Sequence, residues 1–292
     1  MARFVDQFFT QITGPSQNAS DRESPKLVLL HGVMGYALNW RRVAKHFEDR
    51  FQVLAYDSRG HGRSVHADLS VSPDAASPEA LAEDLRRILD DLGWKKIDLI
   101  GHSMGGRVAY TFAATYPERV EALVIEDIGP NMSAVTASTA TRVLDRVPVP
   151  FVTKKAAKEW FETQFPIIFK DTPGASALGP WLYANMTEDE QGRGVWRFQV
   201  EMIRGAVESG RTQDRWDEIE QLACPTLVVR GERSTELPRE VYQKMLKVGG
   251  RVGGGQMEGV EITDAGHWVH SEQTEAFNSA VDRFLMKHNA WR

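Results

Sequence analysis

The chain of 292 residues has little cysteine, no long apolar run and no excess of charge of either sign. Its one cysteine, Cys224, excludes an internal disulfide, and its place beside Pro225 before an apolar stretch predicts a buried thiol. No stretch is apolar over the length that a bilayer requires, and the first residues lack the pattern of a secretion signal. We therefore expect a cytoplasmic protein without stable membrane insertion.

The charges are balanced: 35 basic and 40 acidic residues give a formal net charge of -5. Without a basic face, nucleic acid is not an expected partner, and a small, roughly neutral molecule is easier to accommodate. The histidines and the single cysteine do not show the spacing of a metal site. We expect neither a metal nor an organic cofactor, and the composition does not define an oligomeric state.

The residues that are present predict an α/β fold. Short apolar runs alternate with helical patterns, and continuous apolar strands are typical of a sheet that helices cover on both faces. A helix is expected over 78–93, because leucine and isoleucine recur there at helical spacing and Gly93 marks its end. The expected strands are 26–30, 52–56, 97–101, 122–126, 226–230 and 259–263.

The alternation of strands and helices fails between about residues 131 and 216. This stretch reads as several helices rich in large apolar side chains, which predicts an insertion between two strands. We expect a sheet-based core formed by 1–130 and 217–292, with a helical insertion at 131–216. Part of its aromatic content should hold the insertion together, and the rest should line an apolar acyl pocket.

The segment GHSMG (101–105) joins an apolar strand to a helix and presents one serine. A strand-to-helix turn this tight requires small residues two positions before and after Ser103, and both positions are glycine. The turn would lift the hydroxyl clear of the sheet and leave the Met104 amide free to face developing negative charge. The alternative is a glycine-rich turn in which the serine has no function.

A serine nucleophile needs a histidine that takes its proton. Among eight histidines, His267 follows the last apolar strand on a loop and should reach the same sheet edge as Ser103. His270 is expected to pack or hydrogen-bond near the following helix, and His102 should point away from the cleft. The turn in LLHGVMG (29–35) would aim the Val33 amide at Ser103 as a second oxyanion donor.

The segments HGVMG, YDSRGHGRS, GHSMGG and GHWVH occur in this order along the chain. In order and spacing they resemble the α/β-hydrolase superfamily over nearly the whole sequence. The resemblance implies an eight-stranded, mostly parallel sheet and a helical cap after the sixth strand. It also implies a catalytic serine, histidine and acid.

The acid departs from the superfamily's usual pattern. It commonly follows the seventh strand, but here the position three residues after Gly231 is Ser234. Glu232 and Glu236 flank that position without occupying it. After the preceding strand, Asp127 stands at a strand end before a Gly-Pro turn.

The segment around Asp127 resembles the YbfF/ABHD11-like subfamily of small serine esterases, which favours Asp127 as the acid. Glu232 and Glu236 stay open as alternatives, and Asp127 could instead cap a turn. Asp57 is expected to brace the loop that contains Arg59.

Serine at the turn excludes the alkyl-enzyme route that superfamily members with aspartate there follow. We predict a carboxylic ester hydrolase that forms a serine acyl-enzyme from small esters with short to medium acyl chains. Ser103 would attack the carbonyl, His267 would transfer the proton, and the Val33 and Met104 amides would bind the oxyanion. The alternatives are a C–C bond hydrolase of the same fold and a non-catalytic ligand-binding protein.

Overall fold

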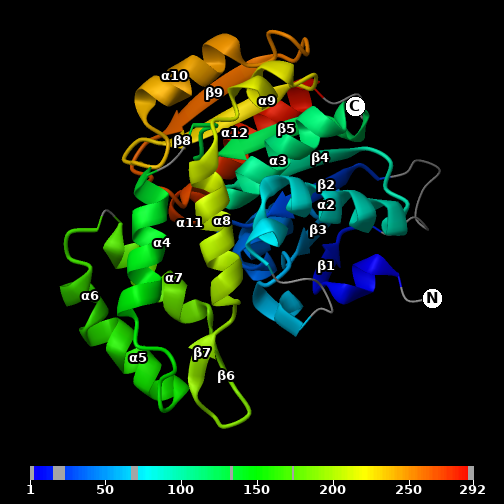
Figure 1. The fold of residues 1–292 in the computed structure, drawn as a ribbon. Helices are drawn as coiled ribbons and strands as arrows, with labels where there is room; N and C mark the ends of the chain where they lie inside the picture. Colours follow the sequence, from blue (N-terminus) through cyan, green and yellow to red (C-terminus); the bar gives the residue numbers. More distant parts are fainter. Residues whose placement is uncertain (1–2, 16–23, 67–71, 132–133, 173, 289–292) are drawn as a thin grey trace.

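Within residues 3–15, 24–66, 72–131, 134–172 and 174–288, which the computed structural model describes, the chain forms a seven-stranded sheet with helices on both faces (Figure 1). The strand order is β1-β3-β2-β4-β5-β8-β9, and every neighbouring pair is parallel except β1 with β3. The predicted α/β class is confirmed. The strands are β1 (Thr10–Thr13), β2 (Lys26–Leu30), β3 (Gln52–Tyr56), β4 (Ile97–His102), β5 (Val120–Glu126), β8 (Thr226–Gly231) and β9 (Met257–Ile262).

Helices cover the two faces of this sheet and bury two apolar clusters. On one face lie α2 (Pro78–Leu92), α3 (Met104–Thr115), α9 (Trp216–Gln221) and α10 (Arg239–Val248). On the other lie α1 (Arg41–Phe47) and α12 (Thr274–His288), the latter preceded by α11 (Val269–Glu272). Short 3-10 helices are η1 (Phe4–Gln7), η2 (Ala37–Trp40), η3 (Gly62–His66), η4 (Pro73–Ala76) and η5 (Pro117–Arg119). None of the described helices is both long and apolar enough to cross a bilayer.

The predicted helix over 78–93 is α2. Ser77 caps its amino end by accepting a hydrogen bond from the Ala80 N–H, and Pro78 fits the first helical turn. Gly93 ends the helix with a positive φ of 69°. The helix buries its leucine and isoleucine side chains against the sheet, as the periodicity predicted.

The implied eight-stranded sheet is wrong for the described residues, which supply seven strands. Only β1 precedes β2 in the described sequence. The chain before β1 forms η1 instead of another edge strand, because Phe4 and Val5 pack into the apolar cluster beside α2. The Val5 N–H donates to Asp91 at 2.9 Å, which fixes this segment on α2.

The segment between β5 and β8 lies beside the sheet and has its own apolar cluster (Figure 1). Its helices are α4 (Ala134–Arg146), α5 (Lys154–Thr163), α6 (Phe165–Ile168), α7 (Ala175–Ala184) and α8 (Val200–Thr212), followed by α9 on the sheet. A hairpin of β6 (Met186–Glu188) and β7 (Gly194–Trp196), which the sequence did not predict, completes it. Asp189 makes the hairpin turn by accepting hydrogen bonds from the Gln191 and Arg193 N–H groups. The division into core and cap stays a prediction.

Candidate active site

The turn between β4 and α3 holds Ser103 in a strained backbone conformation, with φ 55° and ψ -119°. A Cβ atom at Gly101 would lie 2.2 Å from the Gly105 carbonyl oxygen, and one at Gly105 would lie 2.4 Å from the Leu30 oxygen. Both positions therefore require glycine, as the sequence predicted. The serine is only 2% exposed, so a substrate must enter the fold to reach it.

The turn after β2 runs beside Ser103. The Gly35 N–H donates to the Gly32 carbonyl at 2.9 Å, and a Cβ at Gly32 would lie 3.2 Å from the Ser103 Cβ. This close approach brings the turn that contains Val33 to the start of α3. In the described part of the chain, neither the Val33 nor the Met104 N–H donates to a protein acceptor.

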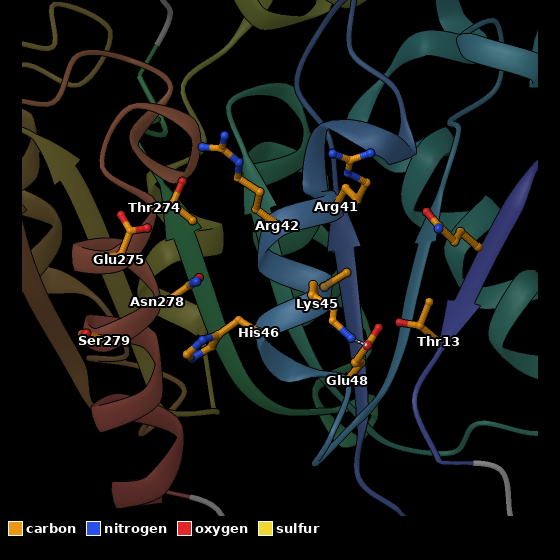
Figure 2. A pocket seen from close by; sticks show the side chains of 12 residues that line it. Thr13, Arg41, Arg42, Lys45, His46, Glu48, Thr274, Glu275, Asn278 and Ser279 are labelled. Atoms are coloured by element: carbon orange, nitrogen blue, oxygen red, sulfur yellow. Dashed lines mark hydrogen bonds and ion pairs between the residues drawn. The ribbon is translucent and has the colours of Figure 1, made fainter.

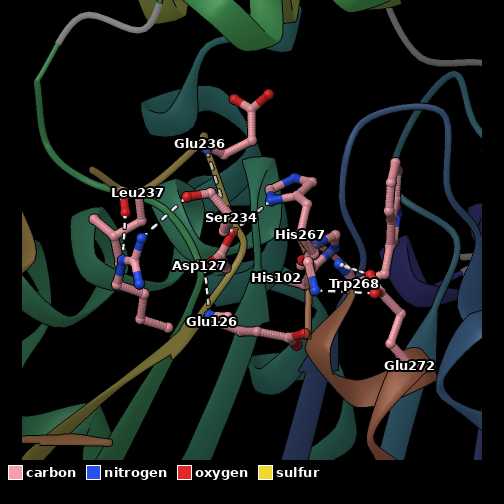
Figure 3. Close-up of polar contacts among 12 residues, drawn as sticks. His102, Glu126, Asp127, Ser234, Glu236, Leu237, His267, Trp268 and Glu272 are labelled. Carbon is pink, nitrogen blue, oxygen red and sulfur yellow. Dashed lines mark hydrogen bonds and ion pairs between the residues drawn. The ribbon is translucent and has the colours of Figure 1, made fainter. Parts of the chain in front are cut away.

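Asp127 and His267 meet although 140 positions separate them in the sequence (Figure 3). The His267 Nδ1 lies 2.9 Å from Asp127 Oδ2. Asp127 is fully buried at the end of β5 with a positive φ of 53°. Its Oδ1 accepts a hydrogen bond from the Gly231 N–H at 2.9 Å, and its Oδ2 accepts one from the Ser234 hydroxyl. These donors fix the carboxylate toward the His267 ring.

Burial opposes charge on both members of this pair. It raises the pKa of Asp127, although the hydrogen bonds from His267 and Ser234 act against that rise. Burial alone would lower the pKa of His267, but the hydrogen bond and the charge of Asp127 outweigh it and raise the pKa above its ordinary value. A proton that His267 receives is therefore stabilised by Asp127.

The two alternative acids, Glu232 and Glu236, occupy other positions on the β8 loop, and Glu236 also faces His267. Glu232 accepts a hydrogen bond from the Asp264 N–H at 3.0 Å on the protein surface. Glu236 lines the same cavity as His267, and Figure 3 shows its carboxylate directed away from Asp127. Of the three acidic residues proposed from the sequence, Asp127 is the one hydrogen-bonded to the His267 ring.

Ser103 and His267 are not hydrogen-bonded to each other among the described residues. They are connected through His102, whose Nε2 lies 2.9 Å from the His267 carbonyl oxygen. His102 is buried, and burial lowers its pKa well below the ordinary value, so its ring is neutral. Catalytic hydrogen bonds are often formed only when substrate binds.

The family model for the alpha/beta hydrolase fold matches residues 25–274. The chain belongs to this family. The sn-1-specific diacylglycerol lipase ABHD11 of Mus musculus is 31% identical over 277 residues, covering 91% of this chain and 82% of the relative. Its counterpart in Danio rerio is 29% identical over 269 residues, covering 90% and 79%.

Solved structures agree with the family assignment. A marine microorganism esterase is 26% identical, with a TM-score of 0.76, and the match covers 95% of this chain and 99% of that one. E-2-(acetamidomethylene)succinate hydrolase is 20% identical with a TM-score of 0.77 over 97% of both chains. The second likeness concerns the fold alone.

Two buried side chains brace the loops of this hydrolase. Asp57 accepts hydrogen bonds from the Ala37 N–H at 2.6 Å and the Arg63 N–H at 2.7 Å, so the predicted bracing role is confirmed. His31 contacts the Gly32 carbonyl through Nδ1 at 2.8 Å, while its Nε2 accepts from the Ser58 N–H at 3.0 Å. Burial lowers the pKa of His31 to about 4, so the ring is neutral.

Ser234 contacts the candidate site, and in the sequence it stands out only because an acid is absent at its position. The residue stands where the superfamily commonly has its carboxylate, and its hydroxyl instead donates to Asp127. Ser234 Oγ also accepts a hydrogen bond from the Glu236 N–H at 3.1 Å. The sequence offered one signal, a hydroxyl residue three positions after Gly231, where the superfamily commonly has its acid.

A cavity of about 430 Å³ opens beside the His267 ring. The β8 and β9 loops form one side, with Ser234, Glu236, His267 and Trp268 among the lining residues. The inserted segment forms the other side through residues of α4 and α7. Polar and apolar groups share the walls of this cavity, whereas the sequence predicted an apolar acyl pocket.

The apolar side chains of the inserted segment line a second cavity, of about 660 Å³, between α5, α6 and α7. Phe161 and Phe165 contribute to its wall, and Ser176 lines both cavities. An acyl pocket in this region stays a prediction, since Ser103 lines neither cavity.

A third cavity is remote from these residues. It is a groove of about 710 Å³ between α1 and α12, and Figure 2 shows arginine and lysine side chains of α1 on one wall. None of the candidate catalytic residues lines it.

Two observations concern metal ligands and the cysteine in the described part of the chain. No cluster of three or more histidine, cysteine, aspartate or glutamate side chains there is arranged to hold a metal ion. Cys224 is a buried free thiol, as predicted, and burial raises its pKa to about 11.

Proposed function

We propose that this protein is a carboxylic ester hydrolase that forms an acyl-enzyme on Ser103. The observation that carries the proposal is the hydrogen bond between His267 and the buried Asp127, in a fold that also holds Ser103 in the strained turn before α3. A serine, a histidine and an acid on separate loops of one sheet edge are what acyl transfer requires. The mouse and zebrafish relatives, named as lipases, support the same reaction class.

In the first half of the reaction, the Ser103 oxygen attacks the ester carbonyl carbon while the His267 Nε2 takes the hydroxyl proton. Asp127 accepts from Nδ1–H, which holds the ring with Nε2 toward the serine and stabilises the imidazolium. The carbonyl oxygen becomes negatively charged, and the free amides of Val33 and Met104 donate to it. His267 then returns the proton to the leaving alcohol, which departs and leaves the acyl group on Ser103.

In the second half, water attacks the acyl carbonyl as His267 takes one of its protons. The same two amides stabilise the second tetrahedral intermediate. Its collapse breaks the bond to Ser103, the serine oxygen regains a proton from His267, and the carboxylic acid leaves. These two half-reactions need only the protein groups named above and one water molecule.

We further propose small esters with short to medium acyl chains as substrates. The burial of Ser103 supports this choice, because only a molecule that enters the fold can react. A cytoplasmic location, and the absence of nucleic acid among the partners, are also part of the proposal. The balanced charge and the single cysteine support them.

The test is hydrolysis of p-nitrophenyl esters of increasing acyl length by the wild type, with Ser103→Ala, Asp127→Asn and Glu232→Gln assayed beside it. Activity should be lost with Ser103→Ala and fall by about a thousandfold or more with Asp127→Asn, because the histidine loses its orientation and its countercharge. Glu232→Gln is the matched control, since its surface carboxylate contacts the Asp264 backbone. It should retain wild-type rates.

Two results would overturn the proposal. One is a wild type that hydrolyses none of the esters, and the other is Ser103→Ala that hydrolyses them as fast as the wild type. A collapse with Glu232→Gln but not with Asp127→Asn would leave ester hydrolysis standing and assign the acid to the other loop. The profile of rate against acyl length measures the depth of the acyl pocket.

A further inference from the structure

Glu126 directly precedes the acid, yet its carboxylate serves another residue. The side chain is fully buried and Figure 3 shows it extending beneath His102 and His267. Its Oε1 accepts from the His270 backbone N–H at 2.8 Å, and the His270 Nδ1 lies 2.8 and 2.9 Å from the two carboxylate oxygens. A carboxylate can only accept, so the His270 Nδ1 carries the hydrogen.

The backbone of Glu126 contacts the other half of the site. Its carbonyl oxygen accepts a hydrogen bond from the Ser103 N–H at 3.0 Å, in the turn that presents the nucleophile. One residue thus bonds to the serine turn through its main chain and to the histidine loop through its side chain. His270 lies three positions after His267, so the second contact sets where that loop starts α11.

The His270 ring has little freedom to move relative to Glu126. It stacks on Trp40, with ring centroids 4.2 Å apart and planes inclined by 27°. It also meets His102 edge to face at 5.1 Å. Because His270 is 4% exposed, no solvent can replace the carboxylate if that contact is lost.

We propose that Glu126 is a positioning residue for ester hydrolysis, which holds the His267 loop, through His270, in register with the Ser103 turn. The proposal rests on the function proposed above. Asp127 orients the His267 ring, whereas Glu126 sets the place of the backbone from which that ring extends. A misplacement of about 1 Å between catalytic groups lowers turnover by up to about a hundredfold.

The charge of Glu126 adds a second, measurable effect. The groups that face His267 come from three places: Glu126 at the end of β5 with Asp127 directly after it, Glu236 from the β8 loop, and the neutral His102 from β4. Burial disfavours the protonated ring, and the three carboxylates favour it, with Asp127 contributing most. Removing the Glu126 charge should therefore lower the pKa of His267, by less than removing Asp127 does.

The experiment compares Glu126→Gln with Asp84→Asn in p-nitrophenyl ester hydrolysis from pH 5 to pH 9. Asp84 is a matched control because it is also a buried carboxylate. It lies on α2, however, and pairs with Arg59. In Glu126→Gln we expect kcat to fall at least about tenfold with KM little changed. The acidic limb of the kcat/KM profile should move to lower pH. Asp84→Asn should lower the melting temperature and leave the limb in place.

A pair of substitutions at His270 tests the contact from its other side. His270→Ala removes the ring donor, and His270→Asn restores an N–H near the same place. We expect His270→Ala to lower kcat and His270→Asn to recover part of it. Equal activity of the two variants would contradict the proposal, and this pair decides the matter if Glu126→Gln does not fold.

A direct titration separates failure of this inference from failure of the proposed function. NMR of ring-labelled histidine follows His267 without any substrate. A lower His267 pKa in Glu126→Gln than in the wild type and Asp84→Asn supports the inference. If the wild type hydrolyses esters but Glu126→Gln keeps its kcat and its His267 pKa, the inference is overturned alone. If the wild type hydrolyses none of the esters, the proposed function is wrong, and so is the positioning role that rests on it.

Discussion

The Ser234 hydroxyl helps to hold the proposed catalytic acid, Asp127, which follows β5 and not β8. Asp127 is held by donors that come from the β8 end, namely the Gly231 N–H and the Ser234 hydroxyl. The position where an acid commonly stands thus contributes a donor to Asp127, the acid that we propose in its place. Hydrogen bonds to a buried charged group are worth about 1.5–3 kcal/mol each.

Replacing Ser234 with alanine should therefore lower kcat by about tenfold or more, since a carboxylate that loses one donor orients His267 less well. Ser234→Thr keeps a hydroxyl and should recover part of the rate. Thr163 in α5 also has a hydroxyl that donates a hydrogen bond, but it is exposed and lines none of the three cavities, so Thr163→Ala is the control and should match the wild type. Steady-state kinetics with one ester decides this, and an unchanged kcat in Ser234→Ala would show that the bond does not support catalysis.

At the scale of elements, the join between β4 and α3 depends on close backbone approach. Gly105 lies against the end of β2, where a Cβ would come 2.4 Å from the Leu30 oxygen. Carbonyl oxygens in a fully buried strand have no space into which they could shift. The start of α3, directly after Ser103, thereby packs tightly against the strand that leads to the Val33 turn.

We predict that Gly105→Ala destabilises the protein by about 1–3 kcal/mol through overpacking and also lowers ester hydrolysis, because the turn must move. Gly93→Ala provides the contrast. Its φ of 69° makes alanine cost about 1 kcal/mol, but the space around it is open. Denaturant unfolding and ester assays of both variants test this. Loss of activity in Gly93→Ala equal to that in Gly105→Ala would contradict the steric explanation.

The elements near the site were predictable where local sequence determines them. The apolar runs, the helix at 78–93 and the glycines around Ser103 each follow from spacing alone. The β6–β7 hairpin was missed because a single turn, set by the Asp189 side chain, interrupts a stretch with a helical composition. The contact of Glu126 with His270 joins residues 144 positions apart, and no local pattern encodes such a pair.

At the scale of the whole molecule, buried neutral histidines couple stability to pH. Burial lowers the pKa of His31 to about 4 and that of His61 to about 3, and the two rings lie 5.1 Å apart. An unfolded histidine binds a proton near pH 6.5. Below that pH the unfolded chain therefore binds more protons than the folded one, and acid favours unfolding.

The free energy of unfolding should thus be highest above about pH 6.5 and fall as the pH decreases toward 4, by about 3 kcal/mol for each ring. His61→Phe should reduce the slope of stability against pH. His46→Phe provides the control, since the His46 side chain is 37% exposed and pairs with Asp282 on the surface. Urea unfolding of the three proteins at several pH values measures the slopes, and an unchanged slope in His61→Phe would refute the assignment.

The origin of the three proposed catalytic residues has a practical consequence for exchanging parts between hydrolases. Ser103 follows β4, Asp127 follows β5 and His267 follows β9, so all three lie outside the segment from α4 to α8. That segment nevertheless forms one wall of the cavity at His267. A chimera that receives this segment from a relative would keep its own catalytic residues while acquiring a different substrate selectivity. The exchanged segment would have to begin after Asp127.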